Sequence, residues 1–250
     1  MTHILLRQAH FYCRLALILV KTAYIAGATL FYLPLLNSNH KQKLIHSWID
    51  GYLGLLGVSG QLVNSDILPT QPFMLVANHI SWLDFFVLQS LYPARVVAKA
   101  EVSRIPFVGS LAKAIGIIYT DRHRTFSVKQ TISDIARVLQ TESVCIFPEG
   151  TTHLSYQIMP FKPTLLQSAI DADVPVIPLA IKYVEMATGN KTNAPAYFHV
   201  SFGTTLVQIL RNQPIKAIFE VCPPAANGLN RGELANYCHS TIIDSLSLNY

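Results

Sequence analysis

The sequence predicts an α/β fold, with a mixed but mostly parallel central sheet flanked by helices and preceded by an N-terminal hairpin of two helices. Two observations predict it. From residue 58 onward, short apolar runs alternate with helix-length stretches, a pattern typical of strands covered by helices on both faces of a sheet. Before residue 58, the chain is more apolar still. We therefore expect a membrane-associated motif at 1–57 and one continuous α/β domain at 58–250.

The composition indicates contact with lipid. Hydrophobic residues make up 51% of the 250-residue chain and charged residues only 13%, with a mean hydropathy of +0.34. An ordinary soluble enzyme is less apolar. The net charge of +5 at pH 7 suits an anionic partner, and composition alone allows a phosphate, an anionic membrane or a nucleic acid. The four cysteines have no C-x-x-C or metal-binding spacing, which predicts free thiols in a reducing compartment.

The first predicted helix lies in the apolar stretch 11–36, which Arg14 and Lys21 interrupt. Its uninterrupted run, 22–36, has 15 residues, fewer than the ~20 that span hydrocarbon. Basic residues recur at helical spacings and so share one stripe of the helix. They are His3, Arg7, His10, Arg14 and Lys21. Such a stripe on an apolar helix is typical of helices that lie in the interface of an anionic membrane.

A second amphipathic helix is predicted between Lys41 and Leu56, after a break at Pro34 and 37–39. Its apolar face comprises Leu44, Ile45, Trp48, Ile49, Tyr52 and Leu55. We interpret 1–57 as a two-helix hairpin docked on the cytoplasmic face of a membrane. A single membrane span is the main alternative, and a cleaved signal peptide is disfavoured because charges interrupt the apolar region.

The remaining elements follow from runs of apolar and β-branched residues that alternate with amphipathic stretches. Strands are expected at 61–63, 73–77, 95–98, 117–119, 144–147, 176–180, 197–202 and 217–221. Helices are expected near 82–91, 107–115, 125–141, 164–172, 204–211 and 231–246. No repeat or linker divides this part of the sequence, so the α/β domain is predicted to be continuous.

A histidine and a carboxylate lie five residues apart where the strand 73–77 gives way to a helix: His79 and Asp84. On a regular helix they would point about 140° apart, so they can meet only if His79 precedes the helix. Ser81 and Asp84 fit a capping pattern that places Ser81 at the N-cap. Asp84 would then hold one ring nitrogen of His79 and leave the other as a general base. The spacing equally allows a capping aspartate beside an ordinary loop histidine.

Three further strand ends carry polar groups. Lys99 follows the strand 95–98, and Arg122 lies in a basic cluster after 117–119. Arginine can donate two parallel hydrogen bonds to a phosphate. Glu149, Gly150 and Thr151 follow the strand 144–147, in the kind of loop that usually places ligand-binding groups. Taken singly, each could equally be a solvated turn, a surface cluster or a helix cap.

In order and spacing, these stretches resemble the four conserved blocks of the glycerolipid acyltransferases, and more narrowly the PlsC-type 1-acylglycerol-3-phosphate acyltransferases. The blocks are Asn78-His79 with Asp84, then 116–122, then Phe147-Pro148-Glu149-Gly150-Thr151, then 174–181. The resemblance covers 58–250, and the apolar N-terminus is similar to the membrane anchor of that family. The pair of His-x4-Asp and Phe-Pro-Glu-Gly-Thr in this order is specific.

The resemblance assigns roles to individual residues. It implies that His79 is the general base, that Asp84 orients it, and that Arg122 binds the phosphate of the acceptor. It associates the third block, with Glu149, Gly150 and Thr151, with binding of the glycerol phosphate. It makes Lys99 a further phosphate contact, and Pro178 matches the proline of the fourth block. Main-chain amides at the start of the helix after His79 are candidates for an oxyanion hole.

The implied reaction moves a fatty acyl chain from acyl-CoA or acyl-carrier protein to the free hydroxyl of 1-acylglycerol-3-phosphate, which gives phosphatidic acid in phospholipid biosynthesis. A thioester is already activated, so no covalent nucleophile, cofactor or metal is expected, and the partners are a lysophospholipid, the thioester donor and a membrane surface, with no nucleic acid. Pro163 and the sequence Thr-Thr-His at 151–153 depart from the common pattern toward the lyso-ornithine lipid acyltransferases. That acceptor is the alternative, and a non-catalytic lipid-binding protein is a third possibility.

Overall fold

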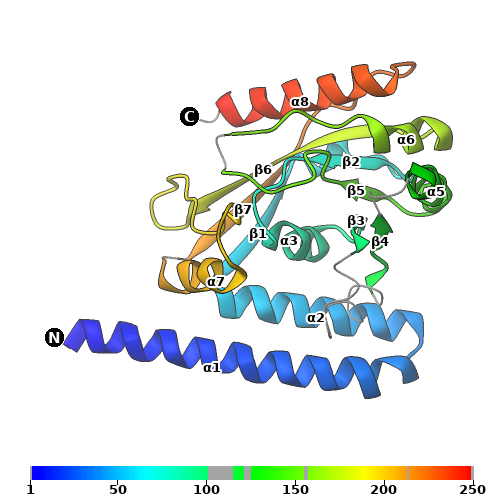
Figure 1. Cartoon of the computed structure of the whole chain (residues 1–250). Coiled ribbons are helices and arrows are strands. Elements are labelled where there is room, and N and C mark those ends of the chain that lie inside the picture. Colours follow the sequence, from blue (N-terminus) through cyan, green and yellow to red (C-terminus); the bar gives the residue numbers. More distant parts are fainter. Residues whose placement is uncertain (1, 101–114, 121–124, 155–156, 213, 249–250) are drawn as a thin grey trace.

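The structure, a computed structural model of the whole chain, describes residues 2–100, 115–120, 125–154, 157–212 and 214–248. Within these residues, seven strands form one sheet in the order β1-β7-β6-β2-β5-β3-β4 (Figure 1). The strands are β1 Val58–Val63, β2 Met74–Ala77, β3 Arg95–Lys99, β4 Ile118–Thr120, β5 Val144–Ile146, β6 Val176–Glu185 and β7 Ile215–Val221. Only β6 and β7 pair antiparallel among them. The predicted mixed, mostly parallel sheet is confirmed.

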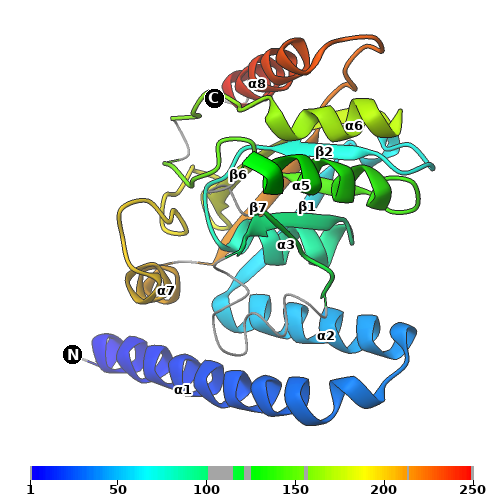
Figure 2. The same ribbon diagram turned by 45° about the vertical axis from the view of Figure 1, so that its right-hand side comes forward.

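Helices cover both faces of the sheet (Figures 1 and 2). They are α1 Thr2–Phe31, α2 Ser38–Leu56, α3 Leu83–Leu91, α5 Thr125–Val138, α6 Gln167–Ala172, α7 Phe202–Arg211 and α8 Arg231–Leu248, with short 3-10 turns at Leu33–Leu35, Ser65–Ile67 and Thr164–Leu166. Residues of α2 and α3 belong to one hydrophobic core, whereas residues of α5, α6 and α8 belong to a second. Strand β2 serves both cores, because its side chains alternate between the two faces.

The alternation in β2 explains why its sequence is apolar throughout. Leu75 and Ala77 lie in the core beneath α3, and Met74 and Val76 lie in the core beneath α5, α6 and α8. All four are at most 2% exposed. A strand covered on both faces cannot alternate apolar with polar residues, so β2 is a central strand by composition as well as by position.

Beyond β2, the side chain of Asn78 continues the pairing with β6. Its Nδ2 donates to the main-chain oxygen of Ile181 at 3.0 Å, and its Oδ1 accepts from the main-chain nitrogen of Ile181 at 2.7 Å. Asn78 is fully buried. It therefore supplies the two hydrogen bonds that a further ladder residue would have made, and it attaches the loop after β2 to the middle of β6.

Several predicted strands differ from the structure. Strand β1 begins at Val58, three residues before the predicted start at 61. Residues 197–202 are predicted to form a strand, but 197–201 form a loop and Phe202 begins α7. In this loop Tyr197 donates its main-chain N–H to Ile80, and Ser201 caps α7 by accepting from Thr204 at 3.1 Å. Strand β6 runs to Glu185, five residues past the predicted end at 180, because it pairs with all of β7. Most of the predicted helix 107–115 lies outside the described residues.

Helices α1 and α2 lie side by side on the α3 side of the sheet (Figures 1 and 2). The segment Gln8–Phe31 of α1 is 24 residues long with a mean hydropathy of 1.5, which is long and apolar enough to cross a membrane. Large apolar side chains cover its exposed surface and that of the following turn: Tyr12, Leu17, Leu19, Val20, Tyr24, Leu30, Phe31, Tyr32 and Leu35. The uninterrupted run of 22–36 therefore understates the apolar length of this helix, because the helix continues through Arg14 and Lys21.

The predicted basic stripe does not face outward at Arg14 and Lys21. Arg14 Nε donates to the main-chain oxygen of Leu55 at 2.8 Å, and Nη1 donates to that of Leu210 at 3.5 Å. Lys21 Nζ lies 5.5 Å from the ring centre of Tyr52. The charges of these two residues therefore point toward α2 and α7, whereas the predicted stripe has them facing lipid. Membrane docking of 1–57 stays a prediction.

We predict that Asn78→Ala lowers the free energy of unfolding by about 2–4 kcal/mol, because the buried N–H and carbonyl of Ile181 would each lose a partner. Chemical unfolding of the detergent-solubilised protein, followed by tryptophan fluorescence, measures this change. Asn39→Ala, on the exposed surface of α2, is the matched control and should change stability by less than about 0.5 kcal/mol. Equal stabilities of the two variants would contradict the proposed role of Asn78.

Candidate active site

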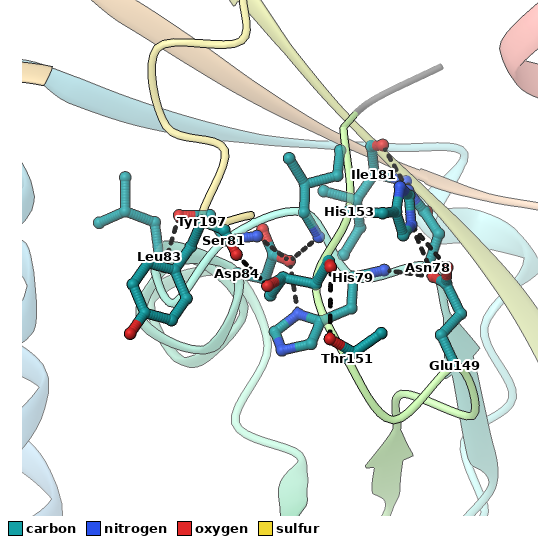
Figure 3. A network of polar contacts seen from close by, with 12 residues as sticks. Asn78, His79, Ser81, Leu83, Asp84, Glu149, Thr151, His153, Ile181 and Tyr197 are labelled. Atoms are coloured by element: carbon teal, nitrogen blue, oxygen red, sulfur yellow. Dashed lines mark hydrogen bonds and ion pairs between the residues drawn. The ribbon is translucent and has the colours of Figure 1, made fainter. Parts of the chain in front are cut away.

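The side chains of His79 and Asp84 meet at the carboxyl end of β2, in the turn that leads into α3 (Figure 3). Nδ1 of His79 lies 2.8 Å from Oδ2 of Asp84. The Asp84 side chain is completely buried, whereas that of His79 is 23% exposed. His79 precedes the helix, which is the only placement that the five-residue spacing allows for such a contact.

Asp84 collects further hydrogen bonds from its surroundings. Oδ2 also accepts from the main-chain N–H groups of Ile80 and Ser81 at 2.8 and 3.0 Å, and Oδ1 accepts from the hydroxyl of Tyr183 at 2.6 Å. A carboxylate with this many donors is stabilised in its ionised form. It can therefore only accept from His79, so Nδ1 carries a proton, and in the neutral imidazole the lone pair is on Nε2.

The capping interpretation and the base interpretation are compatible in this turn. Ser81 Oγ accepts from the main-chain N–H of Leu83 at 3.2 Å, while Asp84 accepts from that of Ser81. Both bonds cap the N-terminal end of the helix, and α3 is first regular at Leu83. Together with the bond from Ile80 to Asp84, they occupy the main-chain amides of Ile80, Ser81 and Leu83, so these three amides are already used and do not supply the predicted oxyanion hole.

The third block lies beside His79 because β2 and β5 are neighbouring parallel strands. Their carboxyl ends meet at one edge of the sheet, and Phe147 directly follows β5. The ring of Phe147 stacks on the imidazole of His79, with 4.2 Å between ring centres and 22° between planes. The stack and the bond to Asp84 together restrict the orientation of the His79 ring.

Glu149 points into the protein. Its side chain is completely buried. Oε1 accepts from the main-chain N–H of His79 and from Nε2 of His153, both at 2.8 Å. Oε2 accepts from the main-chain N–H of Met159 at 2.8 Å. Both oxygens are therefore occupied by protein donors. This geometry argues for a positioning role of Glu149 in place of the expected direct contact with the glycerol phosphate.

Gly150 and Thr151 complete the turn of the third block. Gly150 has a φ of 72°, in the left-handed region that glycine adopts with little strain, and its N–H donates to Phe147 at 3.1 Å. Thr151 is exposed, so its hydroxyl is accessible to a ligand. Thr152 reaches in another direction, because its hydroxyl donates to the main-chain oxygen of Tyr197.

The two predicted phosphate ligands are not brought to His79 by any described contact. Lys99 is the exposed last residue of β3, in register with Thr120 of β4. Strand β5 lies between β2 and β3, so Lys99 is at the same edge of the sheet as His79 but two strands away, about 10 Å across the sheet. Arg122 lies outside the described residues.

Two buried groups near the site stay protonated. Burial, and then the charge of Asp84, raise the pKa of Tyr183 well above its usual value, which keeps its hydroxyl as a donor. The same two causes raise the pKa of the Cys145 thiol far above its ordinary value. Cys145 is thus an inert packing residue, as its apolar strand predicts.

Sequence reasoning missed the roles of four side chains in this site: Asn78, Phe147, His153 and Tyr183. The sequence carries a signal for Tyr183, because the residues after the predicted end of β6 at 180 continue a strand-like pattern. A longer predicted strand would have included Tyr183. His153 was noticed only as a departure from the family pattern. Its position four residues after Glu149 did not by itself indicate that their side chains pair.

Comparisons with known proteins find similar sequences and a similar fold. The acyltransferase family model matches residues 61–182. A 1-acyl-sn-glycerol-3-phosphate acyltransferase of Neisseria gonorrhoeae is 31% identical over 172 residues, covering 68% of this chain and 67% of that protein. A lyso-ornithine lipid O-acyltransferase of Pseudomonas aeruginosa is 29% identical over 205 residues, covering 81% and 78%. The crystal structure of PlsC from Thermotoga maritima matches with a TM-score of 0.69 at 20% identity, over 99% of this chain and 97% of that one, which supports the fold.

We predict that Tyr183→Phe lowers the turnover number for acyl transfer by about 10-fold, because Asp84 would lose the 2.6 Å hydrogen bond that helps to hold it against His79. Steady-state kinetics measure the change, and circular dichroism should show an unaltered fold. Tyr237→Phe is the matched control, since its hydroxyl donates to the Pro223 and Pro224 carbonyls. Equal turnover in the two variants would show that Tyr183 does not contribute.

Proposed function

This chain belongs to the acyltransferase family, and we propose that it moves a fatty acyl chain from an acyl thioester to the free hydroxyl of 1-acylglycerol-3-phosphate. The product is phosphatidic acid, a precursor in phospholipid biosynthesis. The observation that carries the proposal is the pairing of His79 with buried Asp84, which leaves Nε2 of a partly exposed imidazole able to take a proton. The acceptor follows the name of the relative that is 31% identical.

In the proposed reaction, Nε2 of His79 removes the proton from the acceptor hydroxyl as its oxygen attacks the thioester carbonyl. A C–O bond forms, a tetrahedral intermediate collapses, and the C–S bond breaks. The imidazolium then returns the proton to the departing thiolate, so His79 ends as it began. Asp84 stabilises the imidazolium through Nδ1–H. A positioned base of this kind typically contributes about 10²- to 10⁴-fold.

The donor is proposed to be acyl-CoA or acyl-carrier protein, because both present a thioester that needs no covalent enzyme intermediate. The same chemistry requires no cofactor or metal. Lys99 and Arg122 are proposed to bind the acceptor phosphate, and Thr151 is proposed to contact the glycerol phosphate through its exposed hydroxyl. Hydrogen bonds from cationic side chains to phosphate are roughly twice as strong as neutral ones.

The acceptor is a membrane lipid, so the proposal includes docking of the N-terminal helices on the cytoplasmic face of a membrane. The exposed apolar side chains of α1 and the following turn support membrane association, because large apolar side chains that gather on an exposed surface can mark a membrane interaction site. An enzyme held at the membrane surface can take its lipid substrate from the membrane and release its lipid product into it, without transfer of either lipid through water.

A second candidate acceptor is lyso-ornithine lipid. The relative of that name from Pseudomonas aeruginosa aligns over 81% of this chain, and His153 departs from the common pattern of the third block. Lyso-ornithine lipid carries no phosphate. The need for a phosphate ligand therefore distinguishes the two acceptors.

The test is an assay of the purified protein in detergent, with radiolabelled acyl-CoA or acyl-carrier protein and a panel of lysolipids. We expect 1-acylglycerol-3-phosphate to be acylated fastest, and His79→Ala to abolish transfer while leaving the fold intact, because the side chain lies in a turn and is 23% exposed. Faster acylation of lyso-ornithine lipid would favour the second acceptor. Acylation of no lysolipid would reject the enzyme proposal, and an active His79→Ala variant would reject the base.

We predict that Arg122→Ala raises the KM for 1-acylglycerol-3-phosphate by about 10- to 100-fold, because a charged hydrogen bond to phosphate would be lost. The KM for the thioester donor should not change. Arg137→Ala is the control, since Arg137 is exposed on α5 and paired with Asp134 at 3.1 Å. An effect of Arg122→Ala on the donor alone would contradict its role at the phosphate.

A further inference from the structure

We propose that His153 is a positioning residue for His79, and that a buried ion pair of His153 with Glu149 clamps the main chain of His79 in place. The inference rests on the proposed function, in which His79 is the general base. It assigns His153 a function in that site, although this side chain touches neither the imidazole of His79 nor, in the proposed reaction, the substrate.

The clamp holds both main-chain groups of His79. The N–H of His79 donates to Oε1 of Glu149 at 2.8 Å, and its C=O accepts from the main-chain N–H of His153 at 3.1 Å. The groups on the two sides of the His79 Cα atom are thus tied to one five-residue loop. Because these groups set the direction of the Cα–Cβ bond, the loop determines the position of the His79 Cβ atom. Asp84 and Phe147 determine the orientation of the imidazole ring about its side-chain bonds.

The partners of the His153 ring show that it is an imidazolium. Nδ1 lies 2.6 Å from the main-chain oxygen of Leu154, and a carbonyl can only accept, so Nδ1 carries a proton. Nε2 lies 2.8 and 2.7 Å from the two oxygens of Glu149. Those oxygens also accept from the main-chain nitrogens of His79 and Met159, which stabilises the carboxylate form. Nε2 therefore also donates and carries the second proton.

The electrostatic balance agrees with this protonation state. Burial by itself lowers the pKa of His153, but the hydrogen bond and charge of Glu149, the carbonyl of Leu154 and the charge of Asp84 outweigh it, so the net pKa is raised above the ordinary value. The side chain of His153 is 2% exposed and that of Glu149 is not exposed at all. Removal of one member of such a pair leaves the other as an uncompensated buried charge.

A shift of the loop would displace the base. Effective catalysis requires the reacting atoms to be held in near-attack geometry, and a misplacement of about 1 Å can cost about 100-fold in rate. Loss of His153 frees Glu149 from one donor and removes the charge that holds its carboxylate in place. The expected consequence is a slower chemical step with unchanged binding of acceptor and donor.

The kinetic test compares His153→Ala and His153→Gln with the wild-type enzyme. We expect His153→Ala to lower kcat by about 10- to 100-fold with both KM values unchanged, and His153→Gln to retain more activity, because its amide can still donate to Glu149. His239→Gln is the control, since His239 lies on α8 with a buried ring nitrogen and should leave kcat unchanged. Wild-type kcat in His153→Ala, or a loss expressed only in KM, would overturn the positioning role.

Nuclear magnetic resonance of protein with ¹⁵N-labelled histidine gives a readout that needs neither turnover nor a folded alanine variant. At pH 7, wild-type His153 should show two protonated ring nitrogens, assigned by their loss in His153→Gln. In that variant the Nδ1–H signal of His79 should shift, whereas in His239→Gln it should not. A neutral His153, or an unmoved His79 signal, would overturn the clamp. If the protein acylates no lysolipid but shows a doubly protonated His153 and a shifted His79 signal in His153→Gln, the proposed function alone would be refuted.

Discussion

The site depends on one buried carboxylate. Asp84 has no exposed side-chain surface, and its oxygens accept hydrogen bonds from His79 Nδ1, the hydroxyl of Tyr183 and two main-chain N–H groups of the preceding turn. A carboxylate removed from water is costly unless such donors replace its hydration. The turn, the start of α3 and strand β6 are therefore held in one arrangement. The same arrangement fixes the tautomer of His79, so local stability and the chemistry of the base have a common origin.

Parallel pairing brings the rest of the site to this carboxylate. Strands β2, β5 and β6 are neighbours, and the parallel pairs β2–β5 and β2–β6 set their register. The loop after β5 thus stacks Phe147 on the ring of His79 and places Glu149 against the main chain of His79. On the other side of β2, Ile181 of β6 pairs with Asn78. The first and third blocks hold His79, the fourth block holds the adjacent Asn78, and the side chains of Lys99 and Thr151 are exposed.

Charge placement on α1 fits a helix that meets lipid. Arg14 is satisfied by main-chain carbonyls of Leu55 and Leu210, and Lys21 lies over the ring of Tyr52. Large aliphatic and aromatic side chains make up much of the outward surface. Because a charged group in hydrocarbon is expensive, turning the cations inward suits a helix with an apolar environment on its other side. The spacing of the basic residues predicts charges that face the lipid, whereas in the structure the charges of Arg14 and Lys21 face the protein.

The sequence by itself determined the α/β class, most elements to within a few residues, and the loop that carries His79 and Asp84, because apolar periodicity and capping are local properties. Tertiary structure alone decided which side chains meet across those elements. The five-residue spacing allowed both capping and catalysis, and it could not show that the hydroxyl of Tyr183 in β6 also donates to Asp84. Glu149 had the pattern of a ligand-binding residue, yet the neighbouring strand turned it inward to His79 and His153. Residues 197–202 had the composition of a strand, but the structure places 197–201 in a loop that is held by the bond from Tyr197 to Ile80, and Phe202 begins α7. Such contacts depend on strand order, which local periodicity does not specify.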